Sequence, residues 1–228
     1  MRRLCAPLVA LLLLTGCGST AGGEAAGGEA GTAQLWVTRD RGATLLLEAE
    51  VDAGQTLMRA LASELEIETR YGGRYLQSAA GLSGSGEAQR DWFWFVNGYE
   101  GDRSATEYRL RAGDVAWWDF RAWEREGEAR VVVGAFPEPF LHGFGGEKRP
   151  AVVRYAPGQE KRARGLAERV GAASVEPLGV AVPEGANVLE VRPGSDGLVG
   201  ELVGESSGDP VRFVWSGDPE PLRRFSIR

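Results

Sequence analysis

Residue types that commonly carry catalysis are scarce in this chain of 228 residues. His142 is the only histidine, and the two cysteines, Cys5 and Cys17, both lie close to the N-terminus. Ser83 and Ser85 lie in a glycine-rich stretch that lacks the lysine of a phosphate-binding loop, and a Ser–His–Asp arrangement would depend on His142 without local support. We therefore expect neither catalytic residues nor a metal site, and a function in binding rather than in catalysis.

Aromatic side chains are concentrated between residues 91 and 123, a stretch that holds five of the seven tryptophans. Broad planar ligands bind by burying area against aromatic faces, so this stretch is a candidate binding surface. His142 lies in a segment rich in proline and glycine, Phe136–Gly146, that could close over the aromatic surface. The candidate ligand contacts are Tyr75, Trp92, Trp94, Trp117, Trp118 and His142. The alternative is that these tryptophans belong to the hydrophobic core.

Two strands are predicted in the aromatic stretch, at Trp92–Val96 and Val115–Trp123, because aromatic residues favour strands and glycine-containing turns separate the two runs. Alternation makes both faces of these strands apolar, so the second face must also be covered. The chain's own C-terminal half, a ligand or a partner protein could cover it. If the helix packs on the face with the phenylalanines, Trp92 and Trp94 stay available to a ligand, and Trp117 joins them only if the register aligns.

Hydrophobic periodicity predicts an α+β fold, with one sheet crossed by a single helix and followed by a small second α/β or α+β unit. We expect a first domain at 34–128 and a C-terminal unit at 129–228. Besides the two aromatic strands, the expected helices are Thr56–Leu65 and Gln159–Val170. The expected further strands are Leu35–Thr38, Thr44–Val51, Glu66–Arg70, Arg74–Ser78, Arg130–Phe136, Ala151–Tyr155, Val188–Val191 and Val211–Trp215, with one more at Val175.

The N-terminal residues form a basic start, Arg2 and Arg3, followed by a short apolar run, Ala6–Leu14, which is too short to span a membrane. The run ends in Leu-Thr-Gly-Cys, which resembles the lipobox of bacterial lipoproteins. This resemblance implies that residues 1–17 are a signal peptide and that Cys17 is lipidated. Residues 18–33, rich in glycine, alanine and glutamate, would then be a flexible tether. We expect an extracytoplasmic protein that is lipid-anchored to the cell membrane.

Four separated motifs resemble the bacterial DUF4430 family, which is similar to the C-terminal β-domain of transcobalamin and intrinsic factor. The resemblance covers about Leu45–Trp123 and implies a β-grasp-like fold. It also implies capture of cobalamin or a related micronutrient, and an energy-coupling-factor-type transporter as partner. Trp94 stands where the animal carriers have a polar glutamine facing the corrin. The four motifs are Gly54-Gln55-Thr56-Leu57, Gly73-Arg74-Tyr75-Leu76-Gln77-Ser78, Val96-Asn97-Gly98 and Tyr108-Arg109-Leu110-Arg111-Ala112-Gly113-Asp114-Val115.

The formal net charge is −6 at pH 7, which disfavours nucleic acid as a partner. Combined with the expected anchor, these features predict a surface-anchored lipoprotein that binds a small molecule for uptake. Cobalamin is one candidate, as a bound ligand rather than a cofactor. The alternative is a structural or interaction lipoprotein that presents its aromatic surface to another envelope protein.

Overall fold

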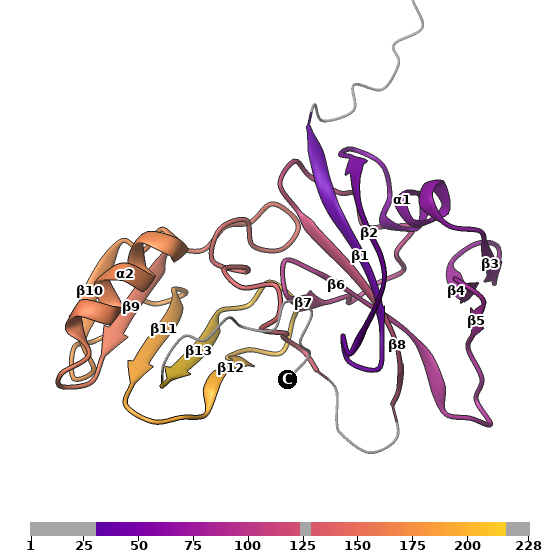
Figure 1. Ribbon diagram of the computed structural model, residues 1–228. Coiled ribbons are helices and arrows are strands. Elements are labelled where there is room, and N and C mark those ends of the chain that lie inside the picture. Colours follow the sequence, from indigo (N-terminus) through magenta and orange to yellow (C-terminus); the bar gives the residue numbers. More distant parts are fainter. Residues whose placement is uncertain (1–30, 124–128, 218–228) are drawn as a thin grey trace, which may run out of the picture.

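The structure, a computed structural model, describes residues 31–123 and 129–217 (Figure 1). The predicted signal peptide, most of the tether and Cys17 therefore lie outside the described residues. Residues 124–128, which end at the expected domain boundary, also lie outside the described residues. The fold belongs to the mixed α+β class, as the sequence predicted, and its described part contains three sheets and two helices.

The tryptophan-rich strands lie inside a five-stranded sheet with the order β2-β1-β8-β6-β7. The neighbours β1 and β8 run parallel, and the other neighbouring strands pair antiparallel. β1 begins at Thr32 and so includes the last two residues of the expected tether. β7 was not predicted, and the other strands lie close to the predicted positions. The strands are β1 (Thr32–Arg39), β2 (Thr44–Asp52), β6 (Arg90–Val96), β7 (Tyr99–Glu100) and β8 (Val115–Ala122).

One face of this sheet is covered by α1 (Leu57–Glu64). The side chain of Thr56 caps the helix by accepting a hydrogen bond from the amide of Arg59 at 3.3 Å. Leu57 and Leu61 are one turn apart and fully buried, in the same core cluster as Trp92 and Trp118. The helix therefore packs on the face with the tryptophans of β6, and not on the phenylalanine face that would have left those tryptophans free.

The opposite face carries Trp36, Phe95 and Trp117, which form a smaller cluster with Val132 and Ala135. The chain's own C-terminal half thus covers the second apolar face, one of the outcomes that the sequence left open. On this face the buried carboxylate of Asp119 accepts hydrogen bonds from the Thr38 hydroxyl at 2.5 Å and from two backbone amides of the β1–β2 turn. These bonds satisfy a charge that would otherwise be costly to bury.

A small three-stranded sheet, β3 (Ile67–Arg70), β4 (Tyr75–Ala79) and β5 (Leu82–Ser83), follows α1 and lies at the edge of the molecule beyond the helix (Figure 1). The turn between β3 and β4 contains Tyr71, Gly72 and Gly73, all with positive φ. Two successive glycines there allow the sharp reversal, because they adopt such angles without steric cost. This reversal brings Tyr75 back beside Asp91 at the start of β6.

The C-terminal unit is a second five-stranded sheet with the order β10-β9-β11-β13-β12, in which only the β12–β13 pair is antiparallel. Helix α2 (Glu160–Val170) packs on β9 through Ala163, Leu166 and Val170 and ends at Gly171 in the left-handed conformation. Neither helix of the described part is long and apolar enough to span a membrane. The strands are β9 (Ala151–Tyr155), β10 (Ser174–Pro177), β11 (Asn187–Arg192), β12 (Gly197–Leu202) and β13 (Val211–Ser216).

The secondary structure differs from the sequence expectations at one predicted strand and at three strands that were not predicted, β5, β7 and β12. Residues 130–136 form turns and a single bridge, Tyr99 with Val131, and not the predicted strand. The predicted apolar alternation is present, because Val131 and Val133 belong to one core cluster and Val132 to the other. The segment pairs with the two-residue strand β7 through a single bridge, and it therefore does not form a strand. β12 was not predicted, because its two glycines and exposed Val199 hide the alternation.

Candidate functional site

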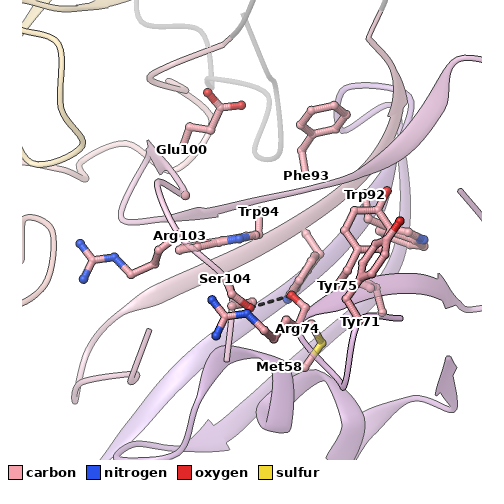
Figure 2. Close-up of a pocket in the computed structure, with 14 residues that line it drawn as sticks. Met58, Tyr71, Arg74, Tyr75, Trp92, Phe93, Trp94, Glu100, Arg103 and Ser104 are labelled. Carbon is pink, nitrogen blue, oxygen red and sulfur yellow. Dashed lines mark hydrogen bonds between the residues drawn. The ribbon is translucent and has the colours of Figure 1, made fainter. Parts of the chain in front are cut away.

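A cleft of about 460 Å³ opens on the tryptophan face of the first sheet, beside the N-terminal half of α1 (Figure 2). It lies where β4, β6 and β8 approach residues 101–105, the segment that follows β7. Four of the six sequence candidates, Tyr75, Trp92, Trp94 and Trp118, line it. The other lining residues are Met58, Tyr71, Arg74, Leu76, Phe93, Glu100, Gly101, Arg103, Ser104 and Ala105.

Trp94 is the central side chain of the cleft and remains partly exposed. One side of its indole packs so closely on Gly101 that a Cβ at residue 101 would lie 2.0 Å from Cε2. Tyr108 contacts the ring edge to face, with centroids 5.6 Å apart. The indole N–H forms no hydrogen bond with any residue of the described part. Trp94 therefore offers a fixed aromatic surface and a free donor.

Trp92 and Trp118 form the buried floor beneath Trp94, with only 7% and 2% of their surfaces exposed. The indole N–H of Trp92 is occupied, because it donates to the carbonyl of Leu82 at 3.2 Å. The N–H of Trp118 is buried and has no acceptor among the described residues. These two residues give the cleft an apolar base, but they have little surface left for direct contact with a ligand.

Two tyrosines stand at the rim on the side of the small sheet (Figure 2). Tyr71 is 77% exposed and contacts Tyr75 edge to face at 5.9 Å. The hydroxyl of Tyr75 donates to the carboxylate of Asp91. Burial, supported by this hydrogen bond, raises the pKa of Tyr75 to about 12, so the phenol stays neutral at physiological pH. The ring of Tyr75 is available to a ligand, whereas its hydroxyl group already donates a hydrogen bond to Asp91.

Two arginines and a serine form the other side of the rim. Arg74 pairs with Glu107, and Arg103 pairs with Asp102 at 2.7 Å. The hydroxyl of Ser104 donates to the carbonyl of Arg74 at 2.6 Å, which holds the turn before β4 against the segment after β7.

Phe93 and Glu100 line the cleft only at its edge, because both side chains are directed to the opposite face of the sheet (Figure 2). The ring of Phe93 lies 4.4 Å from the guanidinium of Arg121. The carboxylate of Glu100 also lies close to Arg121, at 3.7 Å, and is only 15% exposed. The acid nearest the cleft is thus paired with a buried arginine on the far face.

Trp117 does not line the cleft, contrary to the sequence hypothesis. In the pairing of β6 with β8, Trp94 lies opposite Trp118, whereas Trp117 lies opposite Phe95 on the other face. Trp117 is fully buried there, and its indole N–H donates to the Thr38 hydroxyl at 2.8 Å. The register between the strands therefore makes Trp117 a core residue.

His142 also lies outside the cleft. Its Nδ1 is 2.6 Å from Oε1 of buried Glu138, and its backbone amide donates to the same carboxylate at 3.1 Å. Segment 136–146 does not close over the cleft, but Phe144 packs on Tyr108 with the ring centroids 5.1 Å apart. No group of three or more metal-ligating side chains occurs in residues 31–123 and 129–217.

Sequence reasoning missed Tyr71, Gly101 and the two rim arginines. Arg74 lies inside one of the four motifs, directly before Tyr75, which was a usable signal. Gly101 and Arg103 follow β7, and the contact of this segment with Trp94 depends on how the chain turns after a two-residue strand. Nothing in the local sequence indicates that contact.

Comparison with known proteins identifies one part of the chain. No curated protein matches the sequence. Among solved structures, a proposed metal-binding protein from Ruminococcus gnavus ATCC 29149 is 19% identical, over 43% of this chain and 99% of that one, with a TM-score of 0.35. Haptocorrin in complex with Cbi is 16% identical, over 41% of this chain and 25% of that one, also with a TM-score of 0.35. Residues 54–122, which carry the cleft, match the family model DUF4430, described as a domain of unknown function.

Proposed function

We propose that this protein binds a small planar molecule in the cleft around Trp94. The observation that supports the proposal is the partly exposed indole of Trp94, held over a buried aromatic floor in a cleft of about 460 Å³. Ligand sites are usually clefts of roughly 300–1,000 Å³ with apolar walls and a few polar groups. The polar groups here are the free N–H of Trp94 and the arginines of the rim.

We further propose a β-grasp-like description for the first unit. It is supported by a mixed sheet in which the first and last strands, β1 and β8, pair in parallel at the centre, while α1 crosses one face. In this arrangement the ligand would enter at the end of the helix, where the sheet is not covered.

The biological role that we propose is capture of a micronutrient outside the cell by a lipid-anchored protein. Cobalamin is the first ligand to test, because of the resemblance of the sequence motifs to the vitamin carriers. A corrinoid is larger than the cleft, so only one edge of it would be enclosed beside Trp94. An energy-coupling-factor-type transporter would then be the partner that receives the ligand.

A titration with cobalamin tests the binding proposal. We expect quenching of tryptophan fluorescence, after correction for absorbance by cobalamin, and saturation that is confirmed by equilibrium dialysis. Trp94→Ala should weaken the affinity at least about tenfold, the effect of losing roughly 1.4 kcal/mol of contact. Trp123→Ala is the matched control, because Trp123 is 47% exposed and lies outside the cleft.

The same measurements distinguish the alternatives. Binding that is equally strong in the wild type and in Trp94→Ala would show that this cleft is not the site. If neither cobalamin nor a smaller planar compound binds, the interaction lipoprotein becomes the better explanation. In that case Tyr71 and Tyr75 at the rim are the residues to substitute in pull-down experiments with envelope proteins.

Anchoring is tested separately, because Cys17 lies outside the described residues. Cys17→Ala should release the protein from the membrane fraction or block removal of the first residues. Retention of the variant in the membrane at the level of the wild type would show that the lipid anchor is wrong, without affecting the proposal for the cleft.

A further inference from the structure

The charged groups of the cleft are distributed unevenly, although the chain as a whole is acidic. Two guanidinium groups, those of Arg74 and Arg103, belong to the lining. The only carboxylate in the lining is that of Glu100, and its side chain is directed to the opposite face, where it pairs with Arg121. The phenol of Tyr75 is neutral at pH 7, as a tyrosine with the ordinary pKa of about 10 already is, so this residue adds no negative charge.

Both arginines are positioned on one side of the cleft. The hydrogen bond from Ser104 to the carbonyl of Arg74, at 2.6 Å, joins the two segments that carry them. Figure 2 shows both arginines on the Ser104 side of the cleft, and Tyr71 and Tyr75 on the other side. Trp94 lies between these two groups, so one ligand can contact the indole and a guanidinium group together.

The acids that pair with the arginines are exposed and lie outside the lining, and the guanidinium of Arg103 also lies over the ring of Phe144, 5.8 Å from its centroid. In the pair of Arg74 with Glu107 the side chains are 62% and 42% exposed, and in the pair of Arg103 with Asp102 they are 46% and 31% exposed. Ion pairs at such exposure contribute little to stability. A ligand anion that binds beside the apolar floor can therefore compete for these guanidinium groups, which favour carboxylate, sulfonate and phosphate oxygens.

We infer that the ligand of this cleft is a planar aromatic anion, whose ring system contacts Trp94 and whose carboxylate, sulfonate or phosphate group is bound by Arg74 and Arg103. The inference rests on the proposed function, because it assigns a chemical class to the ligand of the same cleft. It adds a requirement for negative charge that aromatic contact alone does not impose.

A matched pair of probes, 2-naphthoate and 2-naphthamide, tests the inference. The two share the ring system and nearly the same shape, and only the first is an anion. Equilibrium dialysis of the full chain should show 2-naphthoate binding about tenfold more tightly than 2-naphthamide, the effect of a charge-assisted hydrogen bond. In Arg74→Gln/Arg103→Gln the affinity for 2-naphthoate should fall about tenfold, while that for 2-naphthamide changes by less than about twofold.

The control variant is Arg59→Gln/Arg164→Gln, which removes the same charge from exposed positions outside the cleft, one of them also paired with an acid. It should keep the preference for 2-naphthoate. The inference would be overturned if the wild type bound both probes with equal affinity. It would also be overturned if the two double variants lost the same amount of affinity for 2-naphthoate.

Trp94→Ala distinguishes an error in the inference about charge from an error in the proposed function. If the cleft is an aromatic site, this variant should bind both probes more weakly than the wild type. If both probes bind as well to Trp94→Ala as to the wild type, or if neither binds the wild type, the cleft is not an aromatic site and both proposals are wrong. If Trp94 is required but the arginines are not, only the inference about charge is wrong. Thermal unfolding of each variant verifies that it is folded.

Discussion

The tryptophans of the first sheet differ in how much of each ring remains exposed. Trp117 and Trp118 are adjacent in sequence and both almost fully buried, yet they belong to different clusters on opposite faces. Trp94 lies opposite Trp118 in the neighbouring strand and is only partly buried. Trp94 remains partly exposed because it lines the cleft, whereas Trp117 is enclosed in the cluster on the opposite face.

Substitution of Trp117 tests its assignment to the core. Trp117→Ala should lower the free energy of unfolding by about 3–5 kcal/mol, because it leaves a large cavity and removes the hydrogen bond to Thr38. Denaturant unfolding measures this loss. The exposed Trp123→Ala should change stability by less than about 1 kcal/mol. Similar losses in the two variants would contradict the burial described for Trp117.

Gly101 is expected to determine the position of the Trp94 ring. Gly101→Ala should weaken the binding of 2-naphthamide, because the new methyl group would overlap the indole and force it to move. Gly86→Ala is the control, since a Cβ at residue 86 has no atom within 4 Å. Equilibrium dialysis provides the comparison. Unchanged binding in Gly101→Ala would show that the observed position of Trp94 is not required.

Among the elements, α1 and the segment after β7 determine the shape of the cleft. The helix brings Met58 to one wall, and residues 100–105 form another wall against Trp94. The backbone amide of Met58 donates to the carbonyl of Ala105 at 3.1 Å, which joins these two elements directly. The first turn of the helix and the segment after β7 are therefore held together by the backbone, independently of the side chains in the cleft.

The packing of α1 is testable at Leu61, which is fully buried. Leu61→Ala should destabilise the protein by about 2–5 kcal/mol through loss of buried area and formation of a cavity. Leu45→Ala, at a position that is 45% exposed, should cost less than about 1 kcal/mol. Urea unfolding of both variants makes the comparison, and a small effect at Leu61 would contradict this packing of the helix.

Over the whole molecule, the two five-stranded sheets share one hydrophobic core. The main cluster contains residues of the first sheet such as Leu35 and residues of the second such as Phe213. Specific hydrogen bonds also cross between the units, including one from the hydroxyl of Tyr99 to the carbonyl of Asp209 at 3.0 Å. The C-terminal unit is therefore structurally coupled to the first unit and covers the second face of its sheet through Val132.

Shared burial predicts that both units unfold together. We expect one transition in urea, with coincident curves from far-UV circular dichroism and from tryptophan fluorescence. Most tryptophans report on the first unit, whereas Trp215 lies in β13 of the second. Two separated transitions would show that each sheet is stable without the other.

The junction between the units should also make stability depend on pH. Burial raises the pKa of Glu138 and that of nearby Asp114, while contacts with His142 act in the opposite direction on both carboxyls. Because the folded state binds the proton of Glu138 more tightly than the unfolded state, its contribution is greatest below pH 4.5, the ordinary pKa. That contribution decreases as the pH rises through the raised pKa.

Glu138→Gln should remove this part of the pH dependence. The free energy of unfolding of the wild type should therefore fall relative to that of the variant as the pH rises above about 4.5. Exposed Glu87→Gln should run parallel to the wild type over the same range. Denaturant unfolding between pH 4 and 8 provides the data, and parallel curves for Glu138→Gln and the wild type would contradict a raised pKa.

The sequence by itself determined most of the local elements and the likeness of residues 54–122 to the DUF4430 family. Periodicity and turn residues predicted α1, to within one residue at each end, and both aromatic strands, because these depend on neighbouring residues along the chain. The same patterns predicted β9 and α2 within one residue at each end. The motifs also indicated the DUF4430 family, which the match at residues 54–122 confirms.

Only the tertiary structure decided which aromatic residues line the cleft. Alternation assigns each tryptophan to a face of its own strand, but the pairing of β6 with β8 decides which residues share that face, and it excluded Trp117. Long-range packing brought Gly101 and Arg103 to Trp94 and directed His142 to Glu138. The physical reason is that register and the packing of helices and loops depend on contacts between residues far apart in the chain, which local periodicity does not specify.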